Sequence, residues 1–227
     1  MRSDHLRQAG IGCALLAAVL TALVVARWRP LLAYDDQVVR DLHSHAVAHP
    51  GVTHTMRILS DWVWDPWTMR ALAAVACVLL WRRGRRERTL RVAVATLVAA
   101  AVQQGLKALV GRERPVWPDP VDSAHFAAYP SGHAMTATVV CGLLLWLLPR
   151  RTPRWAVRAA WAAAVVSVLG VGFTRVYLGV HWPSDVLGGW LLGVALVALV
   201  IAVPGPRRGC ACPGRSPVSP RAGGPAR

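Results

Sequence analysis

The sequence contains six long apolar segments, and this pattern constrains the fold more than any other feature of the chain. They cover residues 9–26, 62–81, 89–110, 132–148, 155–173 and 183–203. About 20 apolar residues cross a bilayer as a helix, because a helix satisfies its own backbone hydrogen bonds in lipid. Charged residues make up only 16% of the 227, too few to coat a soluble globule. The sequence therefore predicts an all-α, polytopic membrane protein with six transmembrane helices.

The first and third segments need comment. The first could be a cleaved signal peptide, since Arg2 and Arg7 precede it. Its apolar run is long for that role and no A-x-A site precedes Arg27, so an uncleaved anchor is favoured. The third carries two glutamines and Lys107 near one end, and these must face protein or water rather than lipid.

Arginines between the segments predict the orientation. The loops at 82–88 and 150–154 are short and rich in arginine, and the N-terminus and the residues after Val203 are also basic. Positive residues stay on the cytoplasmic side, so both termini are predicted to be cytoplasmic. The loops predicted to lie outside, in the cell exterior, are about 27–61, 111–131 and 174–182.

The chain divides into a membrane domain, 1–203, and a Pro/Gly/Arg-rich tail, 204–227, which is predicted to be disordered and cytoplasmic. Within the domain, the outer loop of about 27–61 is too polar to cross the bilayer. Its apolar residues suit an amphipathic helix lying on the outer surface. These residues are Val38, Val39, Leu42, Val47 and Ile58.

Two other kinds of partner are weighed and disfavoured. The net charge of +15 could indicate a nucleic-acid protein, but the arginines fall in short bursts without interleaved aromatic residues. A metal site could use Cys210 and Cys212, which form a lone C-x-C without a companion ligand. It could also use the outer-loop histidines His43, His45, His49 and His54. Pro50 and Gly51 interrupt that group, which makes it a poor metal site. We therefore expect no metal or cofactor, and the arginine pattern leads us to expect no nucleic acid.

The first polar cluster is Lys107-Ala-Leu-Val-Gly-Arg-Glu-Arg114-Pro115, which holds the only lysine of the chain. If the helix continues for two turns, Lys107 and Arg114 lie on one face and Pro115 ends the helix. Two cations on one face at a membrane boundary suit an anion such as phosphate. A pair of side chains that merely reach toward the interface is the alternative.

The second cluster is Tyr129-Pro130-Ser131-Gly132-His133, at the start of the fourth segment. Ser131 is a natural N-cap, and the backbone amides that follow point out of the helix start, where they bind anions. Gly132 lets a ligand approach the main chain, and His133 can give or take a proton. A simple capped helix start is the alternative.

The third cluster runs from Thr174-Arg175 through His181 to Asp185. Pro183 suits the first position of the last helix, which puts Asp185 in the first turn, within reach of the His181 ring. A carboxylate that holds one imidazole nitrogen fixes the tautomer and raises the basicity of the other. This prepares a histidine nucleophile, although a capping Asp beside an interfacial His is the alternative. Together the clusters suit phosphoryl transfer through a phosphohistidine, without the acidic cluster that a Mg²⁺ site needs.

These residues resemble the signature of the type 2 phosphatidic acid phosphatase (lipid phosphate phosphatase) superfamily, which also includes the vanadium haloperoxidases. That signature is K-x6-R-P, P-S-G-H and S-R-x5-H-x3-D, and the chain has all of it in order and spacing. Thr174 replaces the usual serine and keeps a hydroxyl. The resemblance implies that phosphate is bound by Lys107, Arg114, Ser131, Gly132 and Arg175. It implies that His181 attacks phosphorus, Asp185 orients it and His133 protonates the leaving group.

The leading hypothesis is a metal-independent phosphatase that acts on phosphatidate-like lipids or polyprenyl diphosphates at the outer face of the cell membrane. The alternatives are a phosphotransferase with an acceptor other than water and a non-catalytic phospholipid-binding protein. Haloperoxidase activity is disfavoured, because the family's haloperoxidases are larger soluble proteins. Head-group preference is expected from the loop 116–129, through Asp119, Asp122 and His125. The oligomeric state is not predicted.

Overall fold

The computed structural model describes residues 2–204, and every regular element in that range is helical. The elements are α1 (Arg2–Val25), α2 (Arg29–Ala48), α3 (Pro50–Ile58), the π-helical turn η1 (Leu59–Val63), α4 (Pro66–Arg82), α5 (Arg86–Val110), α6 (Gly132–Leu147), α7 (Arg154–Tyr177) and α8 (Pro183–Ala202). The all-α prediction is therefore confirmed for the described residues.

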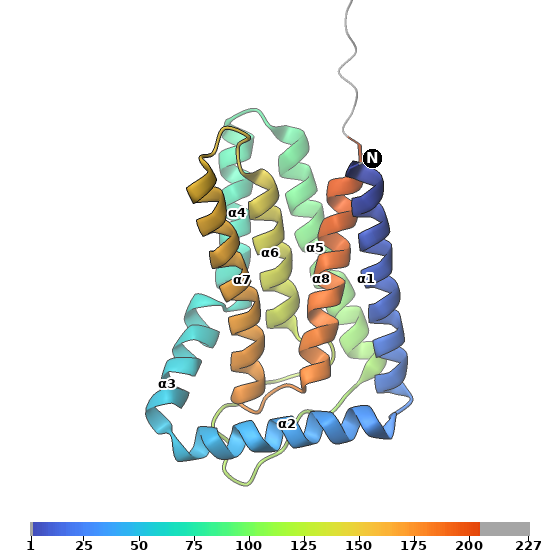
Figure 1. Ribbon diagram of the computed structural model, residues 1–227, viewed down its shortest axis with the longest axis vertical. Coiled ribbons are helices and arrows are strands. Elements are labelled where there is room, and N and C mark those ends of the chain that lie inside the picture. The colour runs from blue at the N-terminus through green and yellow to red at the C-terminus, as the bar shows by residue number, and fades with distance from the viewer. Residues whose placement is uncertain (1, 205–227) are drawn as a thin grey trace, which may run out of the picture.

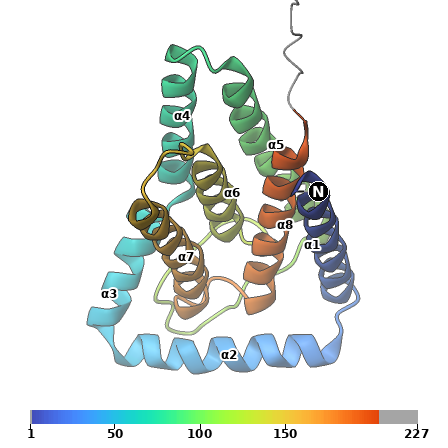
Figure 2. The same ribbon diagram turned by 45° about the horizontal axis from the view of Figure 1, so that its top comes forward.

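Helix α6 lies at the centre of a bundle formed with α1, α4, α5, α7 and α8 (Figures 1 and 2), and it contacts α4, α5, α7 and α8. It can be surrounded because Gly132–Leu147 contains no Asp, Glu, Lys or Arg. Glycines on α8 let the two helices approach closely. A Cβ at Gly189 would lie 2.7 Å from the Ser131 carbonyl oxygen, and one at Gly193 would lie 2.7 Å from the Thr138 Cβ.

Several of these helices can cross a membrane. By length and composition, 5 of the described helical segments qualify, among them Pro50–Arg82, which joins α3, η1 and α4. Helix α6 is apolar but has only 16 residues, so it falls below that length. The structure therefore supports a multi-pass membrane protein, with α6 shorter than the segment predicted for it.

Helix α2 lies across one end of the bundle (Figure 1). The predicted surface helix in 27–61 is therefore present, but its composition was only partly anticipated. The face that it buries is Asp35, Val39, His43 and Ala46. Two of these are polar, whereas Val47 of the predicted apolar face is 45% exposed. Ile58, which was predicted for the same face, lies instead on α3 and is 44% exposed.

Three of the four outer-loop histidines pack against rings. His43 is buried and stacks on Trp117 with ring centroids 4.0 Å apart, so it is not part of a solvated face. His45 stacks on His49 at 3.9 Å. Across residues 2–204, no three His, Cys, Asp or Glu side chains are grouped so as to hold a metal ion.

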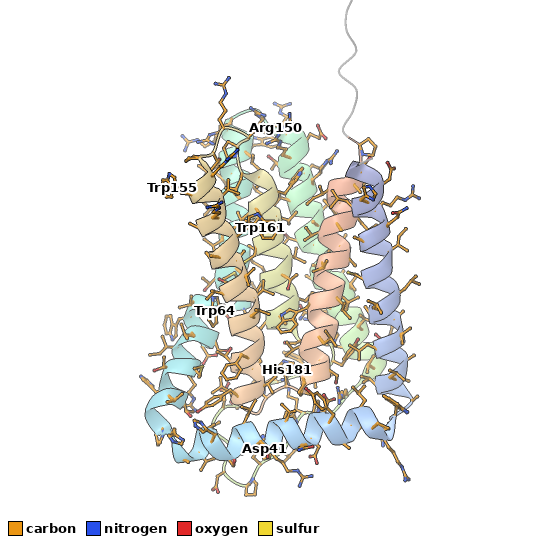
Figure 3. The ribbon with its side chains drawn as sticks, in the orientation of Figure 1. Asp41, Trp64, Arg150, Trp155, Trp161 and His181 are labelled. Carbon is orange, nitrogen blue, oxygen red and sulfur yellow. The ribbon has the colours of Figure 1, made fainter. Side chains whose placement is uncertain are left out.

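The two ends of the bundle differ. The start of α1, the end of α8 and the loops after α4 and α6 lie at one end, and α2 with the turn between α7 and α8 lies at the other (Figure 1). Figure 3 shows Arg150 at the first end and His181 at the second. The predicted disordered tail beyond residue 204, with Cys210 and Cys212, lies outside the described residues.

Candidate active site

A cavity of about 610 Å³ collects most of the predicted site residues at the end of the bundle near α2. Those that line it are Lys107, Arg114, Gly132, His133, Arg175 and His181. Ser131 and Asp185 are fully buried behind them. The structure thus brings together residues from three segments that are far apart in the sequence.

His181 and Asp185 meet as predicted. Helix α7 ends at Tyr177 and α8 begins at Pro183, so Asp185 lies in the first turn of α8. Its Oδ2 lies 3.3 Å from His181 Nδ1 and accepts a hydrogen bond of 2.9 Å from the Trp182 amide. The turn between the helices needs a glycine at position 179, because φ is 67° there and a Cβ would collide with the Trp117 ring.

The contacts of His181 determine which ring nitrogen carries the proton. Arg114 Nη1 lies 3.2 Å from His181 Nε2, and a guanidinium can only donate. Nε2 is therefore the acceptor and Nδ1 carries the proton toward Asp185. Burial, followed by the charges of Arg114, Arg175 and Lys107, lowers the pKa of His181 well below 6.5. The ring is neutral at physiological pH, with its Nε2 lone pair at the cavity.

Lys107 and Arg114 do not share a helical face, which corrects the sequence prediction. Helix α5 ends at Val110, because Gly111 adopts the left-handed conformation with φ 57°. The following loop turns back over the cavity and accepts from both cations. Arg114 Nε donates to the Phe126 carbonyl at 2.9 Å, and the Lys107 ammonium donates to the Ala127 carbonyl.

Burial and the neighbouring Arg175 lower the pKa of Arg114 to about 10. The guanidinium therefore stays charged at neutral pH. Its Nη groups also donate to the carbonyls of His125 and Val180. Arg114 thus joins the loop to the turn that carries His181.

Arg175 is the most deeply buried of the three cations, with 3% of its surface exposed. Its Nη1 donates to Ser60 Oγ at 2.8 Å and lies 3.6 Å from Asp61 and 3.5 Å from Asp122. Its Nε is buried without a hydrogen-bond partner among the described residues. An unpaired cationic donor beside a cavity suits an anionic ligand.

The helix start at Ser131 differs from the prediction in two respects. Its amide donates to the Asp185 carbonyl at 2.9 Å, so it is not available for phosphate. Its hydroxyl makes no capping hydrogen bond and is buried without a partner in the described part of the chain. Gly132 remains next to the cavity, and a Cβ there would lie 2.5 Å from Gln103 Nε2.

Sequence reasoning missed other residues of the site. Arg112 donates to Asp185 Oδ1 and to Asp35 Oδ2, both at 2.7 Å. Arg112 lies inside the K-x6-R-P motif, but nothing in the spacing showed that it faces away from the cavity. Arg70 of α4 also lines the cavity. Of the loop residues proposed to select head groups, Asp122 and His125 line it, whereas Asp119 lines a different cavity.

Residues 88–208, more than half of the chain, match the PAP2 superfamily. The chain belongs to the PAP2 superfamily. Its PAP2 region contains every predicted site residue.

Three curated relatives are enzymes by name. An undecaprenyl-diphosphatase of Sulfolobus acidocaldarius is 29% identical over 64% of this chain and 66% of that protein. A phosphatidylglycerophosphatase B of Bacillus subtilis is 40% identical over 42% of this chain and 47% of that protein. A decaprenylphosphoryl-5-phosphoribose phosphatase of Mycobacterium tuberculosis is 35% identical over 74% of this chain and 89% of that protein. This chain therefore spans less than two thirds of the length of the first two of these relatives.

A solved structure shares the fold. It is the transmembrane PAP2-type phosphatidylglycerolphosphate phosphatase of Bacillus subtilis, with a TM-score of 0.75 and 23% sequence identity. The match covers 85% of this chain and 94% of that one. The bundle around α6 is thus an arrangement that another membrane PAP2 protein also adopts.

Proposed function

We propose that this PAP2 protein is a metal-independent lipid phosphate phosphatase that works through a phosphohistidine. The observation that carries the proposal is the His181 ring, held as the neutral Nδ1–H tautomer with Nε2 at a cavity lined by Lys107, Arg114 and Arg175. A desolvated nucleophile among fixed cations is the arrangement that phosphoryl transfer needs. The relatives named as phosphatases and diphosphatases support the same reaction class.

The chemistry has two steps. In the first, His181 Nε2 attacks phosphorus, the bond to the leaving oxygen breaks, and His133 gives that oxygen a proton. Asp185 stabilises the positive charge that forms on the His181 ring. In the second, His133 takes a proton from water, the water oxygen attacks phosphorus, and the bond to Nε2 breaks. Inorganic phosphate leaves and the starting protonation states return.

The phosphate is held by Lys107, Arg114 and Arg175, with the Ser131 hydroxyl in place of the Ser131 amide. The unpaired Arg175 Nε and Ser131 Oγ support these two contacts. Gly132 has no side chain, so it lets the phosphate approach the main chain closely. These donors neutralise the oxygens of the transferred group, which is the task that a metal ion performs in other phosphatases.

The substrate is a lipid that bears more than one anionic group, with polyprenyl diphosphate as the preferred candidate over phosphatidate-like monoesters. Arg70 supports this choice, because it adds a fourth cation to a cavity that Asp61, Asp65 and Asp122 also line. Its guanidinium lies over the Trp67 ring at 5.3 Å, and Trp67 is 75% exposed. An exposed aromatic beside the cavity on a membrane helix suits a lipid that enters from the bilayer.

We also propose that α6 crosses the membrane in addition to the 5 segments that are long enough, which gives six crossings. Both termini then lie in the cytoplasm, and the active site lies at the outer face of the cell membrane. The arginine-rich loops, the start of α1 and the end of α8 share one end of the bundle (Figure 1), which supports this orientation. Asp41 lies on the far side of α2 from the bundle (Figure 3). Asp41→Cys should react with an impermeant maleimide added to whole cells, and Arg150→Cys should not. The reverse labelling would overturn the orientation.

The test of function is phosphate release from a panel of lipid phosphates in excess EDTA. The panel holds phosphatidate, phosphatidylglycerophosphate and a polyprenyl diphosphate, and His181→Ala is the control. Release by the wild type alone supports the proposal, and the ranking names the substrate. Transfer of phosphate to an added alcohol, without net release, would establish the transferase alternative. Binding without either product would establish the non-catalytic one.

A further inference from the structure

A buried chain of charges joins α2 to the catalytic histidine from the side opposite the cavity. Asp35 of α2 is fully buried, and its Oδ2 accepts from Arg112 Nη2 at 2.7 Å. Arg112 Nη1 donates to Asp185 Oδ1, also at 2.7 Å, and Asp185 Oδ2 faces His181. The Arg112 side chain is 10% exposed, and those of Asp35 and Asp185 are 1% and 0% exposed. None of these three residues lines the cavity.

The same group of residues fixes the start of α8. Ser184 donates its amide to Asp35 Oδ1 at 2.9 Å and its hydroxyl to Asp35 Oδ2. Arg112 Nη1 donates to Ser184 Oγ at 2.7 Å and its guanidinium lies over the Trp182 ring. Asp35 thus caps the helix whose first turn carries Asp185, and Arg112 holds the carboxylate in one orientation.

The charges of Asp35, Arg112 and Asp185 match the chemistry proposed for the site. Arg112 lies between two carboxylates and neutralises one, so a single negative charge remains for the His181 ring. That ring is neutral at rest and becomes positive when Nε2 bonds to phosphorus. A balance of one negative charge favours the positive ring without trapping the resting ring in its protonated form.

We propose that Asp35 and Arg112 are positioning residues that act on His181 through Asp185. The proposal rests on the phosphohistidine function proposed above and adds to it. Neither residue touches the substrate. Arg112 sets the orientation and charge of Asp185, and Asp35 fixes Arg112 while anchoring α8 to α2. The surface helix is therefore part of the active-site architecture.

The proposal predicts opposite effects of two substitutions on one titration. Asp35→Asn removes a negative charge, so it should move the acid limb of kcat/KM to lower pH. Arg112→Gln removes a positive charge, so it should move that limb to higher pH, each by about half a pH unit or more. Each should lower kcat about tenfold or more and leave KM within about threefold. The double variant restores the charge balance, and its limb should return toward that of the wild type.

The interpretation requires the charges around His181 to stay fixed in all variants. The titratable and charged groups that face it, from α5, the 111–131 loop, α6, α7 and α8, are Lys107, Arg114, His133, Arg175 and Asp185. Asp36→Asn is the matched control, because Asp36 neighbours Asp35 on α2 but is 42% exposed and paired with Arg40. It should leave kcat and the pH profile unchanged.

Limbs that stay in place, or that move in the same direction in both single variants, would overturn the proposal and leave only a structural role. Arg112→Lys keeps the charge and loses the forked contact, so it should lower kcat without moving the acid limb of kcat/KM. This variant provides the test if the neutral variants do not fold. The same titration can be followed without turnover, from the pH dependence of His181 carbethoxylation by diethylpyrocarbonate, read by mass spectrometry. Opposite shifts there, in a protein without phosphatase activity, would reject the proposed function and keep the positioning roles.

Discussion

The substitution Asp185→Asn tests the tautomer of the nucleophile. Asp185 accepts from His181 Nδ1, the Trp182 amide and Arg112, so all three partners face it as donors. An asparagine offers one accepting oxygen and an NH₂ group that only donates. In either orientation of the amide a donor faces the NH₂ group, which is Arg112 in one and the Trp182 amide in the other. In the second orientation the NH₂ group also faces His181 Nδ1, which can accept from it only if the His181 proton moves to Nε2. Such a proton would occupy the lone pair that attacks phosphorus.

The expected loss follows from the distance between the charges. Two unit charges separated by the 3.3 Å between His181 Nδ1 and Asp185 Oδ2 attract by about 5 kcal/mol at an effective dielectric of about 20. With roughly half of the ring charge developed in the transition state, about 2.5 kcal/mol is lost, which is on the order of a 60-fold drop in rate. The wrong tautomer adds to this, so we expect kcat to fall by at least about 100-fold.

The assay is steady-state phosphate release from a polyprenyl diphosphate, with wild type and Asp36→Asn run in parallel. Binding of vanadate as a phosphate analogue should stay within about threefold, since the cations of the cavity are unchanged. A drop in kcat of less than about fivefold, in a protein that keeps its thermal stability, would refute the assignment of Asp185 as the partner of the nucleophile.

Three further predictions concern pH, specificity and packing. Burial and nearby cations lower the pKa of His181 well below 6.5. The pH profile of kcat/KM should therefore be bell-shaped, and its acid limb, where His181 gains a proton, should lie below pH 6.5. An acid limb above pH 7, after correction for substrate ionisation, would contradict the neutral ring. Arg70→Gln should raise KM for a polyprenyl diphosphate several-fold more than for phosphatidate, and the exposed Arg57→Gln should change neither; equal effects on both lipids would count against a second anionic contact. Gly189→Ala places a methyl 2.7 Å from the Ser131 carbonyl and should destabilise the bundle by about 1–3 kcal/mol in detergent melts. Gly105→Ala meets nothing within 4 Å and should stabilise α5 by about 0.5–1 kcal/mol, so a similar loss in both variants would reject the packing argument.

The sequence predicted the helical bundle and most of the cavity because these depend on local signals. Long apolar segments indicate membrane helices, and three motifs with fixed spacing indicate the phosphate site. His181 and Asp185 meet as expected because Pro183 begins α8, which is a local property of the chain.

One error overlooked a local signal, because a left-handed glycine such as Gly111 commonly ends a helix. The other errors arose where tertiary contacts decide the outcome. Gly111 ends α5 before Arg114, and the loop brings that cation back by binding it through carbonyl groups. The Ser131 amide is taken by the Asp185 carbonyl of a distant helix. Asp35 is buried in an amphipathic helix whose pattern predicts an apolar buried face, and its pairing with Arg112 and Ser184 explains the exception. No local pattern encodes such a pairing across 77 residues.

The most direct test of the proposed mechanism is to trap the phosphorylated enzyme. A lipid-like aryl phosphate labelled with ³²P has a leaving group that needs no proton, so His133→Gln should complete the first step and stall before the second. We expect an acid-labile, base-stable label at one residue, His181, by mass spectrometry after alkaline quenching. His181→Ala should take up no label. Product formed by His133→Gln with no labelled enzyme, or with the label on another residue, would contradict attack by His181.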